Sequence, residues 1–401
     1  MKIEESLQLG QTLIHNRVVF QPMEGCDCLE DGSPSDLTRA KYVSFAKSGA
    51  GIIWFEANAV CKEGRTNAGQ MSLTKENLPV FQTFLKELRQ IAREESGFEP
   101  LMILQLTHSG RQSIKPMIAY RNPVYEEKRP VTDEAIVSDE YLDSLPEKYA
   151  DSARLAALAG FDGVDVKSCH GYLLQEMLSA YTRKGRYGGS FENRTRLFIE
   201  CINAVKKAVP KDFLVVSRLG VTDMVPYPWG FGTDERNNLD LTEAKLLVQK
   251  IHELGIDLIN ITLGNPYYNP HVNRPYRVGA YKPDESAEVG LKRFWEIEKE
   301  LKTTFPDIVF VGSGLSYYRG EIFQKAEEML REGVCDLVGF GRIILAYPDF
   351  YKRYLSGTFD AKKCCITCSK CTELMRNHCV AGCAVFHEYY KKLYEEKVKH
   401  G

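Results

Sequence analysis

Short runs of β-branched and aliphatic residues recur along the chain, separated by stretches whose apolar positions repeat with the period of an amphipathic helix. The runs predict strands at residues 17–20, 51–54, 101–104, 163–166, 213–216, 257–260, 308–311 and 336–339. Helices are expected between them, among others at residues 79–93, 140–159, 193–209, 242–254 and 319–332. Eight regular strand–helix units favour an α/β fold, a closed parallel (β/α)8 TIM barrel. A doubly wound open sheet is the alternative, but no strand is followed by a complete G-x-G-x-x-G turn.

The pattern changes after Pro348. Cysteines crowd into the segment that follows, and a charged, aromatic helix is expected from about residue 386 to residue 399. We therefore expect one barrel domain, residues 1–358, and a short C-terminal cysteine-rich and helical appendage, residues 359–401. Barrels of this kind carry their chemistry at the carboxyl ends of the strands, so the residues just after each run are the candidates for a site.

Composition narrows the class of protein. Of 401 residues, 44% are hydrophobic and 26% charged, which is ordinary for a globular chain, and no apolar run of about twenty residues could cross a bilayer. The first residues carry no secretory signal, so we expect a soluble, cytoplasmic protein. A net charge of -2 without a basic stripe gives no footprint for nucleic acid or a membrane surface. The expected partner is a small molecule.

Two glycine-containing loops follow the last two predicted strands. Gly312-Ser313-Gly314 follows the seventh strand, and a loop with Gly341 and Arg342 follows the eighth. Glycines let backbone N–H groups approach phosphate oxygens, and an arginine can bond such oxygens with two N–H groups. Plain turn glycines would explain either loop alone, but the pair favours a phosphate site.

Polar residues also stand where a core strand would continue apolar. Gln105 follows the third strand and Arg218 ends the fifth. Buried polar groups need partners. A flavin ring offers them, and an arginine beside it favours the reduced, anionic form. A structural ion pair inside the barrel is the alternative for Arg218.

Several motifs resemble the old yellow enzyme or NADH:flavin oxidoreductase family across about residues 10 to 355. They are the segments at residues 16–23, 105–111, 159–166 and, most specific, Tyr187-Gly-Gly-Ser-Phe-Glu-Asn-Arg-Thr-Arg196. The resemblance implies FMN as cofactor. It also implies that Pro22, Met23, Ala57, Gln105 and Arg218 contact the flavin ring and ribityl chain, and that Gly314, Gly341 and Arg342 hold the FMN phosphate.

The fourth strand departs from the family pattern. Where many relatives carry two polar residues that grip a substrate carbonyl, this chain has Lys167, followed by His170 and Tyr172. By the resemblance His170 is one member of that pair and Tyr172 the proton donor. Lys167 could stabilise an enolate oxygen, act as a Schiff-base nucleophile if burial frees its amine, or simply pair with an acidic neighbour.

Glu24 stands where relatives place a threonine or cysteine that bonds the flavin. An ionised carboxylate there would disfavour the anionic reduced flavin. The residue is therefore a candidate for the cofactor site that could instead face the substrate, for example a cationic group.

Six of the twelve cysteines lie between Cys364 and Cys383. Cys365, Cys368, Cys371 and Cys383 have a spacing that suits a [4Fe-4S] cluster, and a four-cysteine zinc site is the alternative. The segment resembles the cluster segments of trimethylamine dehydrogenase and 2,4-dienoyl-CoA reductase, which favours iron–sulfur. Those relatives continue into a dinucleotide-binding domain that this sequence lacks, so we expect either an electron-transfer partner protein or direct reduction of FMN by NAD(P)H.

The leading hypothesis is an FMN-dependent enzyme that takes hydride from NAD(P)H and reduces the activated C=C bond of an α,β-unsaturated carbonyl compound, with Tyr172 as proton donor. An FMN and iron–sulfur amine dehydrogenase or demethylase is the first alternative. A Schiff-base aldolase that uses Lys167 is the second. A homo-oligomer is also expected.

Overall fold

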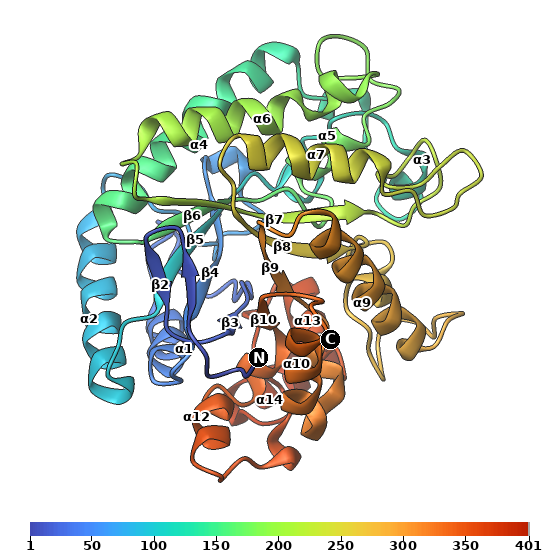
Figure 1. Ribbon diagram of the computed structural model, residues 1–401. Coiled ribbons are helices and arrows are strands. Elements are labelled where there is room, and N and C mark those ends of the chain that lie inside the picture. The colour runs from blue at the N-terminus through green and yellow to red at the C-terminus, as the bar shows by residue number, and fades with distance from the viewer. Residues whose placement is uncertain (400–401) are drawn as a thin grey trace.

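Eight parallel strands form a closed barrel in the computed structural model, which describes residues 1–399 (Figure 1). The strands are β3 (Val18–Phe20), β4 (Ile52–Ala59), β5 (Leu101–Thr107), β6 (Gly163–Val166), β7 (Leu214–Thr222), β8 (Leu258–Leu263), β9 (Val309–Gly312) and β10 (Leu337–Phe340). They follow one another around the barrel, and β10 pairs with β3 to close it. All eight predicted strands are confirmed, and the open-sheet alternative is wrong.

Helices cover the outside of the barrel. The long ones are α1 (Asp36–Ala46), α2 (Leu78–Ser96), α4 (Asp139–Ala159), α6 (Phe191–Ala208), α7 (Thr242–Glu253), α9 (Ala287–Thr304) and α10 (Ile322–Arg331). The short ones are α3 (Pro123–Glu126), α5 (Leu173–Leu178), α8 (Pro270–Asn273), α11 (Arg342–Ala346) and α12 (Phe350–Leu355). The five helices named from the sequence are present. A 3-10 turn at Leu315–Glu321 takes the start of the fifth, so that α10 begins at Ile322.

The helix boundaries have local causes. Ser35, Ser138 and Ser190 each precede a helix, and their hydroxyl oxygens accept from backbone N–H groups three residues on. In α1, for example, Tyr42 packs against Phe55 of β4 and Phe45 against Phe20 of β3. No helix among residues 1–399 is both long and apolar enough to cross a membrane.

An N-terminal hairpin that the strand pattern did not predict closes the amino end of the barrel. It consists of β1 (Leu7–Leu9) and β2 (Thr12–Ile14), which pair antiparallel. Leu9 and Ile14 join a hydrophobic cluster with inward-facing strand residues such as Val19, Ile103 and Val311. This end of the barrel is therefore a packed apolar core.

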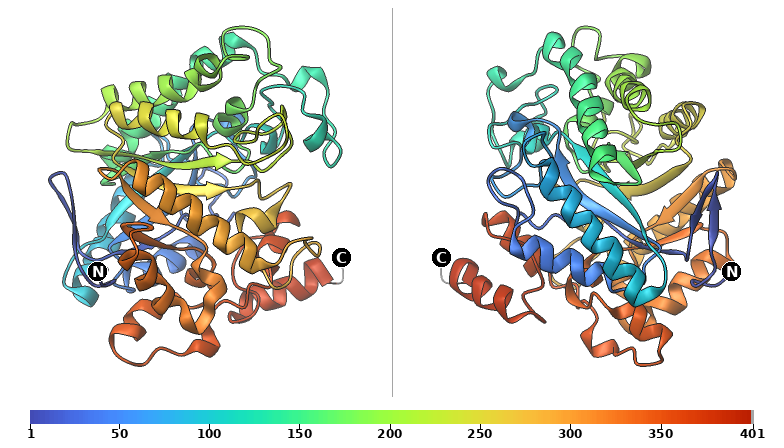
Figure 2. Two further views of the ribbon diagram at one scale, coloured as in Figure 1. Left: turned by 45° about the vertical axis from the view of Figure 1, so that its right-hand side comes forward. Right: turned by 90° about the vertical axis from the view of Figure 1, so that its left-hand side faces the viewer.

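The C-terminal segment packs back onto the barrel. It contains a 3-10 turn (Ala361–Lys363), α13 (Lys370–Arg376), α14 (Glu388–Tyr394) and a final π-helical turn (Glu395–Lys399). The N-terminal hairpin and this segment lie on opposite sides of the molecule in both views of Figure 2. Backbone hydrogen bonds from Ala381 to Gly25 and from Arg277 to Thr367 attach it. The division into residues 1–358 and 359–401 stays a prediction, and residues 400–401 lie outside the described part.

Candidate functional site

One cavity opens at the carboxyl ends of the strands, and it collects nearly all of the predicted catalytic and cofactor-binding residues. Those lining it are Pro22, Met23, Glu24, Ala57, Gln105, Lys167, His170, Tyr172, Arg218, Ser313, Gly314, Gly341 and Arg342. Gly312 is the exception. It is the buried last residue of β9, and a Cβ there would lie 2.8 Å from Cys335 Sγ, so this position faces the outer helices and not the cavity.

Two arginines share one corner of this cavity. Arg342 is buried, and its Nη2 donates to Pro275 O at 2.8 Å, while its Nη1 has no partner. Arg274, which the sequence analysis missed, has an unpartnered buried Nε, and burial together with the charge of Arg342 lowers its pKa to about 10. Neither arginine takes part in an ion pair within residues 1–399. Such a pair of cations requires an anion.

The glycine loops complete this corner. Gly314 has φ +90°, which favours glycine, and Gly341 has only the side chains of Gln21 and Met23 near the place where a Cβ would be. Ser313 Oγ is committed to the barrel interior, because it accepts from Gln21 Nε2 at 2.8 Å and donates to Ile261 O at 3.2 Å. The corner thus offers exposed backbone beside two guanidinium groups, which fits a phosphate.

The middle of the cavity is organised around the buried Asp165 of β6. Its carboxylate accepts from Gln105 Nε2 at 2.7 Å and from the backbone N–H of Arg218 at 2.7 Å. Burial raises the pKa of Asp165 to about 6. The Arg218 guanidinium makes one long contact, 3.4 Å to Pro22 O, and its buried Nε has no partner. The structural ion pair considered for Arg218 is not among the ion pairs of the described residues.

Lys167, His170 and Tyr172 follow β6 and line the same cavity. Lys167 is buried, its Nζ lies 3.8 Å from the centroid of the Tyr172 ring, and burial lowers its pKa. Among residues 1–399 no carboxylate forms an ion pair with it, so the simple acid–base pair is not found.

The backbone at this point is strained. His170 has φ +66° although it is not glycine, and Gly171 has φ +69°. A Cβ on Gly171 would lie 2.2 Å from Asn265 Nδ2, so the position requires glycine. The turn aims His170 into the cavity, where its buried Nε2 has no partner. Burial and the nearby cations lower the pKa of His170 far below its usual value, so the ring is neutral.

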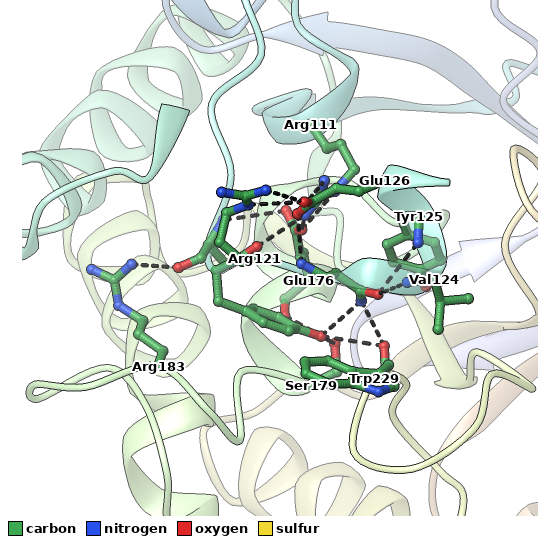
Figure 3. A network of polar contacts seen from close by, with 12 residues as sticks. Arg111, Arg121, Val124, Tyr125, Glu126, Glu176, Ser179, Arg183 and Trp229 are labelled. Carbon is green, nitrogen blue, oxygen red and sulfur yellow. Dashed lines mark hydrogen bonds and ion pairs between the residues drawn. The ribbon is translucent and has the colours of Figure 1, made fainter. Parts of the chain in front are cut away.

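A buried ion pair anchors the helix that carries Tyr172. Tyr172 is the N-cap of α5, and Glu176 lies one turn further on. Glu176 Oε1 accepts from Arg111 Nε at 2.8 Å, and both side chains are almost completely buried. Figure 3 shows Arg111 directed at Glu176, with Glu126 of α3 beside them. This network fixes the start of α5 against the long segment after β5.

Glu24 and two tyrosine hydroxyls form a chain at the edge of the cavity. Tyr172 OH donates to Glu24 Oε2 at 3.3 Å and lies 3.2 Å from Tyr267 OH. Glu24 Oε1 is buried without a partner, and desolvation raises the pKa of this carboxyl to about 7. The sequence identified Glu24 as unusual, but the partnership with Tyr172 and Tyr267 comes from distant segments.

Glu24 is positioned by the residue after it. The N–H of Gly25 donates to Glu56 Oε2 at 2.7 Å, and its carbonyl accepts from the N–H of Ala381. A Cβ on Gly25 would lie 2.3 Å from Lys41 Nζ, which is 2.6 Å from Glu56. The barrel wall and the C-terminal segment therefore hold this turn together.

The four predicted metal-binding cysteines line a second, small cavity next to the first. Cys365, Cys368, Cys371 and Cys383 all border it, and Cys371 and Arg342 border both cavities. Cys364 and Cys379, the two other cysteines of this segment, are not on its walls. Within residues 1–399 no three side chains stand at the separations of a formed metal site. The four thiols therefore border one cavity, and their binding of a metal stays a prediction.

The sequence is similar to known proteins of one family. The family model of the NADH:flavin oxidoreductase / NADH oxidase family matches residues 2–360. NADH oxidase of Thermoanaerobacter brockii is 27% identical over 369 residues, 90% of this chain and 52% of that protein. Cinnamate reductase of Clostridium sporogenes is 26% identical over 402 residues, 95% of this chain and 57% of that protein. The chain spans little more than half the length of these relatives.

The fold recurs in solved structures. The complex of 2-naphthoyl-CoA reductase with 2-naphthoyl-CoA aligns with a TM-score of 0.78 at 21% identity, over 98% of this chain and 58% of that one. The shared architecture extends through the C-terminal segment, because the alignment covers almost the whole chain.

Proposed function

Because the chain belongs to the NADH:flavin oxidoreductase / NADH oxidase family, we propose that it uses FMN and NAD(P)H to reduce the activated C=C bond of an α,β-unsaturated carbonyl compound. The observation that carries the proposal is the row of Lys167, His170 and Tyr172 along one wall of the cavity. His170 and Lys167 each present a nitrogen there that has no hydrogen-bond partner among the described residues. Tyr172 presents a hydroxyl that can give up a proton.

The residues of the cavity fit FMN. Arg274 and Arg342 would hold the phosphate with the backbone at Gly314 and Gly341, since both guanidinium groups have unpartnered N–H groups. Gln105 and Arg218 would bind the ring edge, with Pro22, Met23 and Ala57 against its surface. When bound, FMN supplies a centre that accepts hydride from NAD(P)H and passes it to an alkene.

The side chains after β6 act on the substrate. His170 is neutral, so its unpartnered Nε2 can donate a hydrogen bond to a carbonyl oxygen, and Lys167 adds a second donor or a positive charge. Both would stabilise negative charge that develops on that oxygen. Tyr172 OH would deliver a proton to the α-carbon. The relatives named cinnamate reductase and 2-naphthoyl-CoA reductase support an unsaturated acyl compound as substrate.

A two-step kinetic experiment tests the proposal. Flavin reduction by NAD(P)H is followed without oxygen, and its reoxidation by an enone is followed separately. In Tyr172→Phe we expect reduction to keep its rate and reoxidation to slow by about 10²- to 10⁴-fold, the usual contribution of a general acid. Unchanged reoxidation would remove Tyr172 from this role, and absence of flavin reduction by either nicotinamide would contradict the proposed activity.

We also propose that Cys365, Cys368, Cys371 and Cys383 hold a [4Fe-4S] cluster, which their common cavity supports. Iron, zinc and acid-labile sulfide are measured on protein purified without oxygen. About four irons and four sulfides per chain would agree with the cluster. One zinc and no sulfide would replace it with the structural zinc site.

The two other hypotheses have less support. Amine oxidation needs a cationic substrate, but Lys167 already acts as a positive charge on Glu24. The lowered pKa of Lys167 suits a Schiff base, but that reaction leaves the arginine pair and the FMN family without a role. The cytoplasmic location, the homo-oligomer and the electron-transfer partner remain predictions.

A further inference from the structure

Glu24 lies between the cavity at the carboxyl ends of the strands, in which FMN is proposed to bind, and a third cavity, which we call the outer cavity. The outer cavity is lined by residues of several loops, among them Asn67, Gln112, Arg129 and His378. Four residues border both cavities: Glu24, Tyr267, Met375 and Arg376. Of these four residues, Glu24 is the one with a carboxyl group.

We propose that Glu24 resupplies the proton of Tyr172, taking it from water in the outer cavity and passing it to the tyrosine oxygen after each turnover. This role rests on the proposed function, in which Tyr172 protonates the substrate. It goes beyond that function because it assigns the route by which the enzyme returns to its starting protonation state.

The hydrogen bonds of Tyr172 leave few other routes by which a proton can reach its hydroxyl oxygen. Its side chain is 4% exposed, and within residues 1–399 its hydroxyl contacts only Glu24 Oε2, at 3.3 Å, and Tyr267 OH, at 3.2 Å. Burial raises the pKa of Tyr267 above that of an ordinary tyrosine, so this hydroxyl is a poor proton source. Glu24 is the stronger acid by far, since its pKa is about 7.

The proton balance closes without a further reactant. Tyr172 loses its proton to the α-carbon and becomes a tyrosinate. Protonated Glu24 then gives its proton to the Tyr172 oxygen, and the resulting carboxylate takes a proton from water. The transfer from Glu24 to the Tyr172 oxygen is strongly favourable, because burial raises the pKa of Tyr172 well above 10 while that of Glu24 is about 7.

The surroundings of Glu24 keep it partly protonated near neutral pH, because they raise the pKa of its carboxyl to about 7. Desolvation is the main cause, and the Glu56 carboxylate of β4 adds to it. Lys167 after β6 and Lys41 of α1 act in the opposite direction, as does the hydrogen bond from Tyr172. Arg376 of α13 also borders the wall. Proton resupply should therefore fall as the pH rises through about 7.

Single and multiple turnovers of Glu24→Gln separate this role from a structural one. In the first turnover Tyr172 still holds its proton, so we expect reoxidation of the flavin by an enone at close to the wild-type rate. In steady state we expect a loss of about 10²-fold, the lower range for a positioned acid or base. The inflection of kcat near pH 7 should disappear, and Glu24→Asp should restore part of the rate.

Controls keep the outcomes distinct. Glu30→Gln, at an exposed glutamate of the same loop, should leave both rates and the pH profile unchanged. A Glu24→Gln protein with wild-type steady-state rate and pH profile would overturn the relay. A first turnover as slow as that of Tyr172→Phe would also overturn it, since Glu24 would then act in the chemical step. Wild-type reoxidation in Tyr172→Phe would instead contradict the proposed function.

Discussion

The two ends of the barrel are built from the same eight strands but differ in whether they contain buried polar atoms without a hydrogen-bond partner. At the amino end the hairpin residues Leu9 and Ile14 pack on inward-facing aliphatic side chains and leave a purely apolar core. At the carboxyl end Glu24, His170 and Arg218 each have a buried polar atom without a partner. One end is complete by itself, whereas the other is complete only when a ligand is bound.

The charged groups of the molecule divide in the same way. Buried charges in the wall satisfy one another, as Arg111 does with Glu176 and Lys41 with Glu56. Arg274 and Arg342 in the cavity repel each other instead. Paired charges therefore hold the scaffold, and unpaired ones mark the binding site, since an uncompensated buried charge is costly.

The largest expected effect is on a paired charge. Arg111→Met leaves Glu176 buried without its partner, which should lower the free energy of unfolding by about 3–5 kcal/mol. Arg121→Met, which removes a half-exposed arginine from its pairs with Glu126 and Asp133, should cost about 1 kcal/mol or less. Urea unfolding of the flavin-free proteins measures both, and equal losses would contradict the distinction between buried and exposed pairs.

A smaller loss is expected at the amino end. Ile14→Ala opens a cavity in the apolar core and should lower the free energy of unfolding by about 2–5 kcal/mol. The dissociation constant for FMN should not change, because Ile14 lies at the opposite end of the strands. A large change in FMN affinity in this variant would show that the two ends are not independent.

The unpaired charges should show the reverse pattern. Arg274→Met should weaken FMN binding about 10- to 100-fold, the equivalent of about 1.5–3 kcal/mol for bonds to a charged group. The flavin-free variant should unfold at the same urea concentration or a higher one, because repulsion from Arg342 is removed. Arg293→Met, whose arginine is paired with Glu285, is the matched control and should leave FMN affinity unchanged.

A last effect concerns the pH dependence of stability. The folded protein raises the pKa of Glu24 from 4.5 to about 7, so between these values it holds a proton that the unfolded chain releases. Its contribution to stability is therefore highest below pH 4.5 and falls as the pH rises to about 7. Glu24→Gln should lack this decline. Urea unfolding of both flavin-free proteins at pH 5 and pH 8 makes the comparison, and identical pH dependence would refute it.

The strands were predictable because each is a short, nearly continuous apolar run, as buried parallel strands are. Gln105, Arg218 and the two glycine loops were found because they stand at the ends of those runs. Pro22, Met23, Ala57 and the roles of His170 and Tyr172 came from the family resemblance, and the family match over residues 2–360 confirms that family. The N-terminal hairpin was missed since its three-residue strands are too short for a periodic signal.

Other residues of the site could not be predicted from the sequence, for a different reason. Arg274 and Tyr267 lie in a long segment after β8 that has no regular pattern, and only tertiary packing turns them toward the cavity. The same holds for Met375 and Arg376, which place part of the C-terminal segment in the wall of the site. Contacts between segments that are far apart in sequence leave no local signal.

The central claim is that Arg274 and Arg342, which lack ion-pair partners, bind the phosphate of FMN at the carboxyl end of the barrel. Calorimetric titration of the flavin-free protein with FMN and with riboflavin, which lacks the phosphate, tests it. We expect one FMN per chain and binding of riboflavin that is at least about tenfold weaker, since charge-assisted bonds to the phosphate would be lost. Equal affinities for the two flavins, or no binding of FMN, would contradict the account.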